Sequence, residues 1–238
     1  VLAAVAPAIL GEDRVLVPKR CAMTFLSWAL LAVVGVGGYI RLNGATETNV
    51  DSVILRIVQP NIAQRDKWKP HLQRQHFDKL LGLSSRLGDK AAPGPTHIIW
   101  PETATPIYLS SVKDALRIVS TVVPIGGALL TGAPRQISTP GGPIELWNSV
   151  HVIDSSARIR GTYDKYHLVP FGEYVPFRKY LKIASLTGGR KDFSRGAGQI
   201  SLAVPGAPSV IPLICYEAIF PLQVRLQEYQ RRPGWLLN

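Results

Sequence analysis

Three residues with the chemistry of acyl transfer follow apolar runs along the chain, in the order glutamate, lysine, cysteine. Glu102 stands in Ile-Trp-Pro-Glu, Lys165 in Thr-Tyr-Asp-Lys and Cys215 in Ile-Cys-Tyr-Glu. A thiolate can attack a carbonyl carbon, a carboxylate can take the thiol proton, and an ammonium group can stabilise the oxyanion. The three motifs therefore predict an enzyme that passes through a thioester.

The neighbours of these residues indicate how each would work. Cys215 is expected where a strand ends and a helix begins, so that helix amides, first that of Tyr216, stabilise a thiolate. Glu102 follows a short apolar strand, and Trp100 should exclude water from its carboxylate and make it a better base. The ordinary alternatives are an inert core cysteine, a helix-capping acid and a strand-end lysine. The presence of all three motifs favours the chemistry.

A second glutamate, Glu173, lies between Pro170 and Pro176 among three aromatic residues. A carboxylate in such a setting is costly to bury unless it has a partner. We expect it to orient Lys165 or a substrate amine; the alternative is an acid on a surface loop. The five histidines show no ligand spacing, so neither a metal nor another cofactor is predicted.

The composition describes a basic chain of 238 residues with a formal net charge of +11 and two cysteines. The basic residues are spread along the sequence without a nucleic-acid-binding motif, so nucleic acid is not an expected partner. Two cysteines are too few for a disulfide framework. The densest basic cluster falls within residues 177–195, where it could be a solvated loop or could touch anionic lipid headgroups.

A membrane helix is predicted near the start of the chain. Residues 21–40 contain no charged residue, and a helix of that length can cross about 30 Å of hydrocarbon. A signal peptide and a buried core helix are the alternatives. Lys19 and Arg20 precede the segment, and because positive residues tend to stay in the cytoplasm, the rest of the chain should lie outside it.

The remaining sequence predicts the domain organisation. Residues 1–20 would be the end of an earlier membrane helix and a cytoplasmic loop, 21–41 the transmembrane helix, 42–51 a linker and 52–238 the globular domain. Because the chain lacks an initial Met and ends in an apolar run, we expect a piece of a longer protein.

Short strands alternate with helices in the globular part, which predicts an α/β fold. The expected helices span residues 70–87, 112–122 and 220–230. The expected strands span residues 53–58, 97–100, 125–132, 148–154, 157–164, 209–215 and 234–238.

The three motifs together resemble the Glu-Lys-Cys signature of the nitrilase, or carbon–nitrogen hydrolase, superfamily. Residues 165–176, and Val-Gln-Pro-Asn-Ile-Ala-Gln with Lys-Trp in residues 58–68, are similar to further motifs of its apolipoprotein N-acyltransferase family. The resemblance covers about residues 20–238. It implies a nitrilase-like α-β-β-α sandwich, incomplete at its C-terminus and preceded by a transmembrane helix. It also implies a multi-pass protein of the bacterial inner membrane whose catalytic domain faces the periplasm.

The same resemblance implies the reaction. This family moves a fatty acyl group from a phospholipid to a cysteine, and from there to the N-terminal amine of a diacylglyceryl-cysteine lipoprotein. Cys215 would be the nucleophile, Glu102 the general base, Lys165 the oxyanion stabiliser and Glu173 a second essential glutamate. We expect a monomer without a cofactor.

Three more residues match positions that support the site in this family, namely Trp68, Tyr216 and Glu217. Two other functions remain open. The same residues could serve a membrane-tethered nitrilase or amidase that hydrolyses an amide. The domain could also be an inactive nitrilase-like scaffold that only binds.

Overall fold

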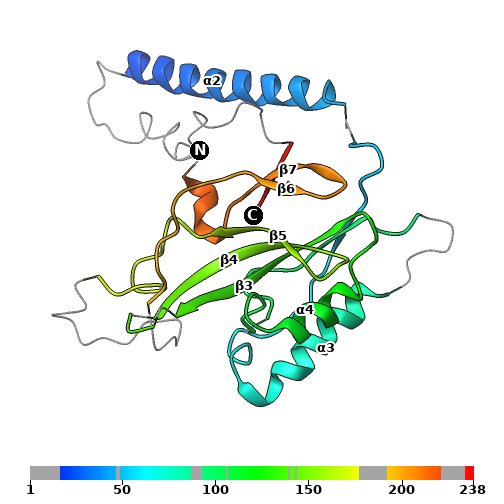
Figure 1. Cartoon of the computed structure of the whole chain (residues 1–238). Coiled ribbons are helices and arrows are strands. Elements are labelled where there is room, and N and C mark those ends of the chain that lie inside the picture. The colour runs from blue at the N-terminus through cyan, green and yellow to red at the C-terminus, as the bar shows by residue number, and fades with distance from the viewer. Residues whose placement is uncertain are drawn as a thin grey trace. The chain divides into compact units, whose positions relative to one another are not determined.

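The computed structural model describes residues 17–46, 49–86, 93–105, 107–138, 140–142, 144–176, 192–220 and 234–238. The chain forms two compact units, residues 1–51 and 52–238. Among these residues, the first unit contains the long helix α2, and the second contains the strands β1 to β8 (Figure 1).

The helix predicted over residues 21–41 is present as α2 (Val17–Asn43). Within it, Ala22–Asn43 has a mean hydropathy of 1.8, and among the described residues this is the one helix long and apolar enough to cross a membrane. Its large apolar side chains are exposed, Phe25 by 77% and Leu42 by 75%. An apolar surface of this kind is compatible with a helix surrounded by lipid.

A mixed sheet of five strands forms the centre of the second unit, in the order β1-β2-β3-β4-β5. The strands are β1 (Leu55–Ile57), β2 (His97–Ile99), β3 (Ala128–Ser138), β4 (Ile144–Asp154) and β5 (Ile159–Asp164). β1, β2 and β3 run parallel, while β3, β4 and β5 run antiparallel.

Parallel neighbours need crossover connections, and here helices provide them. The short 3-10 helix η2 (Pro70–Leu72) and α3 (Gln73–Ser84) lie between β1 and β2, and α4 (Lys113–Ser120) lies between β2 and β3. Both α3 and α4 lie on one side of the sheet (Figure 1).

A smaller sheet lies on the other side. It consists of β6 (Leu202–Val204), β7 (Ala207–Pro212) and β8 (Trp235–Leu237), in that order. Figure 1 shows β6 and β7 across β3–β5 from α3 and α4, so the described layers are helix, sheet and sheet. The helix predicted over residues 220–230, which would belong to the fourth layer, lies almost entirely outside the described residues.

The large sheet is buried on both faces, which explains the long apolar run in β3. Leu129 and Leu130 are adjacent and both fully buried. Successive side chains of a strand point to opposite faces. Leu129 accordingly packs with Phe77 of α3, and Leu130 packs with Val210 of β7. A strand covered on both sides loses the apolar–polar alternation that marks a half-exposed one.

The expected boundaries of β3 and β4 are wrong. The strand predicted over 125–132 runs instead from Ala128 to Ser138, and β4 begins at Ile144 rather than Asn148. The two strands pair continuously from Ala128–Asp154 to Ser138–Ile144, so cross-strand pairing outweighs the strand-breaking tendency of the glycine and proline in β3. β6 was not expected. Most of the basic stretch within 177–195 lies outside the described residues.

His151 of β4 is a buried base that should make the fold sensitive to acid. Its Nδ1 lies 2.9 Å from the hydroxyl of Thr162, and its Nε2 has no partner among the described residues. Burial lowers the pKa of His151 from 6.5 to about 4, more than the carboxylate of Asp164 raises it. The folded protein therefore keeps this ring neutral.

We expect the free energy of unfolding to fall as the pH falls from about 6.5 to about 4. In that window the unfolded chain binds a proton at residue 151 that the folded chain does not bind. The free energy of unfolding should therefore fall by about 3 kcal/mol over the whole window. Urea titrations at pH 7, 5.5 and 4.5 measure it. His151→Gln should flatten the dependence, whereas replacing the exposed His71 should not. An unchanged slope in His151→Gln would contradict the prediction.

Candidate active site

Cys215 lies at the turn between β7 and a short 3-10 helix, η3 (Cys215–Ile219), as the sequence predicted. Its backbone φ is +54°, a left-handed conformation that costs a non-glycine residue about 1–3 kcal/mol. The thiol is free and the residue is exposed. A sharp turn directly after a strand lifts the side chain away from the sheet, where a substrate can reach it.

A cavity of about 680 Å³ brings the predicted site residues together. Six of the seven contribute to its wall: Trp68, Glu102, Lys165, Glu173, Cys215 and Tyr216. They come from segments up to about 150 residues apart in the sequence. The seventh, Glu217, is buried directly behind the turn that holds the thiol.

Lys165 and Glu173 form an ion pair at the inner wall of the cavity. Lys165 is 1% exposed, and its Nζ lies 2.9 Å from each carboxylate oxygen of Glu173. The amide of Val169 donates to Glu173 Oε2 at 3.0 Å, which satisfies a further lone pair. A buried ion pair needs such additional bonds to offset the cost of desolvation. This ion pair is the contact expected if Glu173 orients Lys165, the first of the two roles predicted for it.

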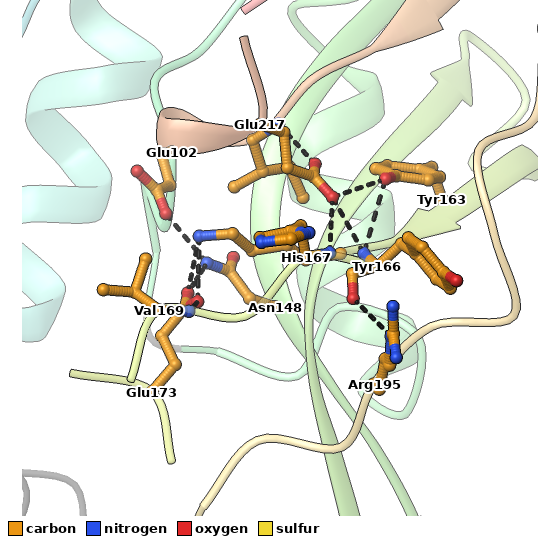
Figure 2. Close-up of polar contacts among 11 residues, drawn as sticks. Glu102, Asn148, Tyr163, Tyr166, His167, Val169, Glu173, Arg195 and Glu217 are labelled. Carbon is orange, nitrogen blue, oxygen red and sulfur yellow. Dashed lines mark hydrogen bonds and ion pairs between the residues drawn. The ribbon is translucent and has the colours of Figure 1, made fainter. Parts of the chain in front are cut away.

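Asn148 of β4 joins this pair to Glu102. Its Nδ2 donates to Glu102 Oε1 at 2.8 Å and to Glu173 Oε1 at 3.0 Å (Figure 2). Its backbone carbonyl accepts the amide of Lys165 at 2.9 Å. One asparagine therefore fixes both carboxylates and the lysine. Asn148 does not stand out in the sequence, because an amide side chain inside a strand belongs to no motif. Its only signal is its place at the start of an apolar run.

The expected influence of Trp100 on Glu102 is wrong. Trp100 is buried in the core, where its Nε1 donates to Ser84 at 2.8 Å and its ring meets that of Phe77 edge to face. Glu102, two residues later, is exposed. Because the strand ends at Ile99 and the chain turns, the indole lies with the helices while the carboxylate reaches the cavity. Water therefore has access to Glu102 in this structure.

Gly132 of β3 allows the Glu102 turn to come close to the sheet. A Cβ at this position would lie 2.6 Å from the amide nitrogen of Thr103 and 2.7 Å from Cα of Glu102. Backbone atoms cannot move aside as a flexible side chain does. The amide of Ala104 donates to the Gly132 carbonyl at 2.9 Å and holds the turn there. Glycine is thus required for the position of Glu102.

Glu217 connects the turn of Cys215 to the segment that follows Lys165. It is 2% exposed and accepts four hydrogen bonds (Figure 2). The donors are Tyr163 OH and the amides of Tyr166, His167 and Ile214, at 2.8 to 2.9 Å. Burial raises the pKa of Tyr163, and the negative charge of Glu217 raises it further. The hydroxyl therefore keeps the proton that it donates to Glu217.

Comparison with known proteins supports the motif analysis. A family model described as carbon–nitrogen hydrolase matches residues 55–231. An apolipoprotein N-acyltransferase of Rhodopseudomonas palustris is 37% identical over 240 residues, covering 98% of this chain and 44% of the relative. That of Bradyrhizobium diazoefficiens is 39% identical over 218 residues, covering 88% and 40%. The chain thus spans less than half the length of these curated relatives.

Among solved structures, an amidase from Nesterenkonia sp. AN1 in complex with acrylamide aligns with a TM-score of 0.47 and 17% identity, over 76% of this chain and 62% of that one. The match of the family model covers most of the second unit and confirms the resemblance seen in the sequence. The chain belongs to the carbon–nitrogen hydrolase family.

Proposed function

We propose that this chain contains the catalytic domain of an apolipoprotein N-acyltransferase. The observation that carries the proposal is the shared cavity, whose wall includes Cys215, Glu102 and the Lys165–Glu173 pair. The relatives that match 88% to 98% of the chain are apolipoprotein N-acyltransferases, which supports this reaction among those of the family. The acyl donor would be a phospholipid, and the acceptor the N-terminal amine of a diacylglyceryl-cysteine lipoprotein.

In the first half-reaction, the sulfur of Cys215 attacks the ester carbonyl of the phospholipid while Glu102 takes the thiol proton. The oxygen of the tetrahedral intermediate gains a negative charge, and the ammonium of Lys165 and the backbone N–H of Tyr216 would stabilise it. The carbon–oxygen ester bond then breaks. Glu102 returns its proton to the leaving lysophospholipid oxygen, and the acyl group remains as a thioester.

In the second half-reaction, the lipoprotein amine attacks the thioester carbonyl. Glu102 takes a proton from the nitrogen, the carbon–sulfur bond breaks, and the thiolate regains that proton. An amide has then formed and the thiol is restored. The amide of Asn148 links the Glu102 carboxylate to Glu173, the partner of Lys165, and this fixed position would let one base serve both steps.

Trp68 and Tyr216 are proposed as supporting residues at the substrate. Both are exposed at the cavity, by 43% and 58%, where aromatic faces can pack against lipid chains. α2 would anchor the domain in the bacterial inner membrane, with the domain in the periplasm. Because donor and acceptor are both lipid-anchored, a tethered enzyme would meet them within one surface.

The two half-reactions provide the test. The protein in detergent micelles is incubated with a phospholipid alone, and its intact mass is measured. We expect an acyl adduct on the protein that hydroxylamine removes. We also expect this acyl group to move to the amine of an added lipopeptide. Rapid release of free fatty acid, or ammonia from a small amide, would favour the nitrilase or amidase. Absence of any adduct, with a thiol as slow to alkylate as free cysteine, would favour the binding scaffold.

A further inference from the structure

Lys67 is a second cation in the catalytic cavity, and the proposed reaction does not use it. It lies in the turn of residues 64–68 that precedes η2, and it contributes to the same wall as Glu102 and Cys215. Its Nζ donates to the backbone carbonyl of Glu102 at 2.9 Å. This contact places the ammonium group beside the residue proposed as the base.

The two ammonium groups of the cavity differ in their partners. Lys165 is paired with Glu173, so its charge is compensated within the protein. Lys67 forms no ion pair within the part of the chain that the structure describes, and the one hydrogen bond of its ammonium group there goes to a neutral carbonyl. An ammonium group has three donors, so Lys67 can offer two more to a ligand.

The surroundings of Lys67 make an anionic ligand favourable. Partial burial lowers the pKa of Lys67 more than the nearby Glu102 raises it, which means that the charged form lacks full solvation. An incoming anion would supply the missing counter-charge and form charge-assisted hydrogen bonds. Gln64, Thr103 and Gln136 contribute further polar groups to this wall.

We infer that Lys67 binds the phosphate group of the acyl donor, and so selects glycerophospholipids over neutral esters. This inference rests on the proposed function, because it assumes that the donor ester reaches Cys215. In a glycerophospholipid the phosphate is joined to the ester carbonyls only through the glycerol unit. A cavity of about 680 Å³ has room for that unit. Lys67 would then determine specificity rather than take part in proton transfer.

The test compares two acyl donors in one assay. The protein in detergent micelles receives either dipalmitoyl phosphatidylglycerol or the neutral ester p-nitrophenyl palmitate, and the rate of Cys215 acylation is followed by intact mass. Lys67→Met should lower the phospholipid-to-neutral ratio of these rates by about tenfold or more, the value of a lost charge-assisted contact. Lys67→Arg should keep the ratio within about threefold, because the charge remains.

Lys69→Met is the matched control. Lys69 is two residues away and exposed, and it bonds to Asp66 at 2.6 Å rather than contributing to the cavity. Its replacement should leave the ratio unchanged. Lys67→Gln is a second neutral variant for the case in which the methionine variant does not fold, and it should give the same lowered ratio.

Two results would overturn the inference. If the neutral Lys67 variants lose activity equally with both donors, Lys67 only positions Glu102 and does not recognise phosphate. If the ratio does not change, Lys67 does not contact the donor. Failure of the proposed function is distinct, because the unchanged protein would then be acylated by neither donor, and this inference would fall with it.

Discussion

Replacing Cys215 with alanine is expected to abolish acyl transfer, with a loss of about 10⁴-fold or more, as when other covalent nucleophiles are removed. The reason is that Cys215 has the one thiol among the described residues that line the cavity, and a thioester needs a thiol. Incubation with phospholipid should then leave the intact mass unchanged, and no N-acylated lipopeptide should form. The left-handed backbone of residue 215 means that alanine keeps the strain while removing the chemistry.

The other cysteine provides the control for this variant. Cys21 lies in α2, in the other compact unit of the chain, so Cys21→Ser should transfer acyl groups at the unchanged rate. Cys215→Ser should fold but react far more slowly, because a hydroxyl is a weaker nucleophile than a thiol at neutral pH. Acyl transfer by Cys215→Ala at even a tenth of the original rate would refute the proposed nucleophile.

Replacing Glu173 with glutamine is expected to reduce both stability and activity strongly. The variant leaves the ammonium of Lys165, which is 1% exposed, without its counter-charge. Breaking a buried pair from one side typically costs about 3–5 kcal/mol. Acylation should also slow, because Lys165 loses the contact that points it into the cavity. Urea unfolding and the rate of thioester formation measure the two effects separately.

A double variant distinguishes the catalytic role of this pair from its structural one. Lys165→Met combined with Glu173→Leu removes both charges, so the free energy of unfolding should recover much of the loss. Acyl transfer should not recover with the stability, since no cation is left at that position. Glu145→Gln, at an exposed glutamate of β4, is the matched control for removal of one carboxylate charge. Equal stability of Glu173→Gln and Glu145→Gln would show that the buried pair contributes little.

The sequence predicted those parts of the site that depend on local pattern. Cys215 follows a run rich in β-branched residues, and Lys165 follows a segment that contains the strand-forming residues Thr162 and Tyr163. In both places the structure has a strand that ends before the functional residue. Apolar runs report burial directly, and a strand end is where a side chain can leave the sheet. The order of strands and helices could be predicted for the same reason, because apolar runs mark the buried segments.

The parts that were missed depend on contacts between distant segments. Asn148 forms hydrogen bonds with Glu102, which lies 46 positions away in the sequence, and with Glu173, which lies 25 positions away. No local sequence pattern encodes contacts over such separations. The position of Trp100 was misjudged because the turn after β2, rather than proximity in the sequence, decides which side of the sheet a residue faces. β6 is as short as β1, β2 and β8, but its Leu-Ala-Val sequence contains an alanine, which is a weak strand former.

The pairing of β7 with β8 has a consequence for how the protein is made. The amide of Leu213, two residues before the thiol, donates to the carbonyl of Leu237 at 2.7 Å. A ribosome must therefore add more than twenty residues after Cys215 before this support can form. Until then the strained turn lacks one of the bonds that hold it. The turn that carries the proposed nucleophile is in this way completed only after the neighbouring strand has been synthesised.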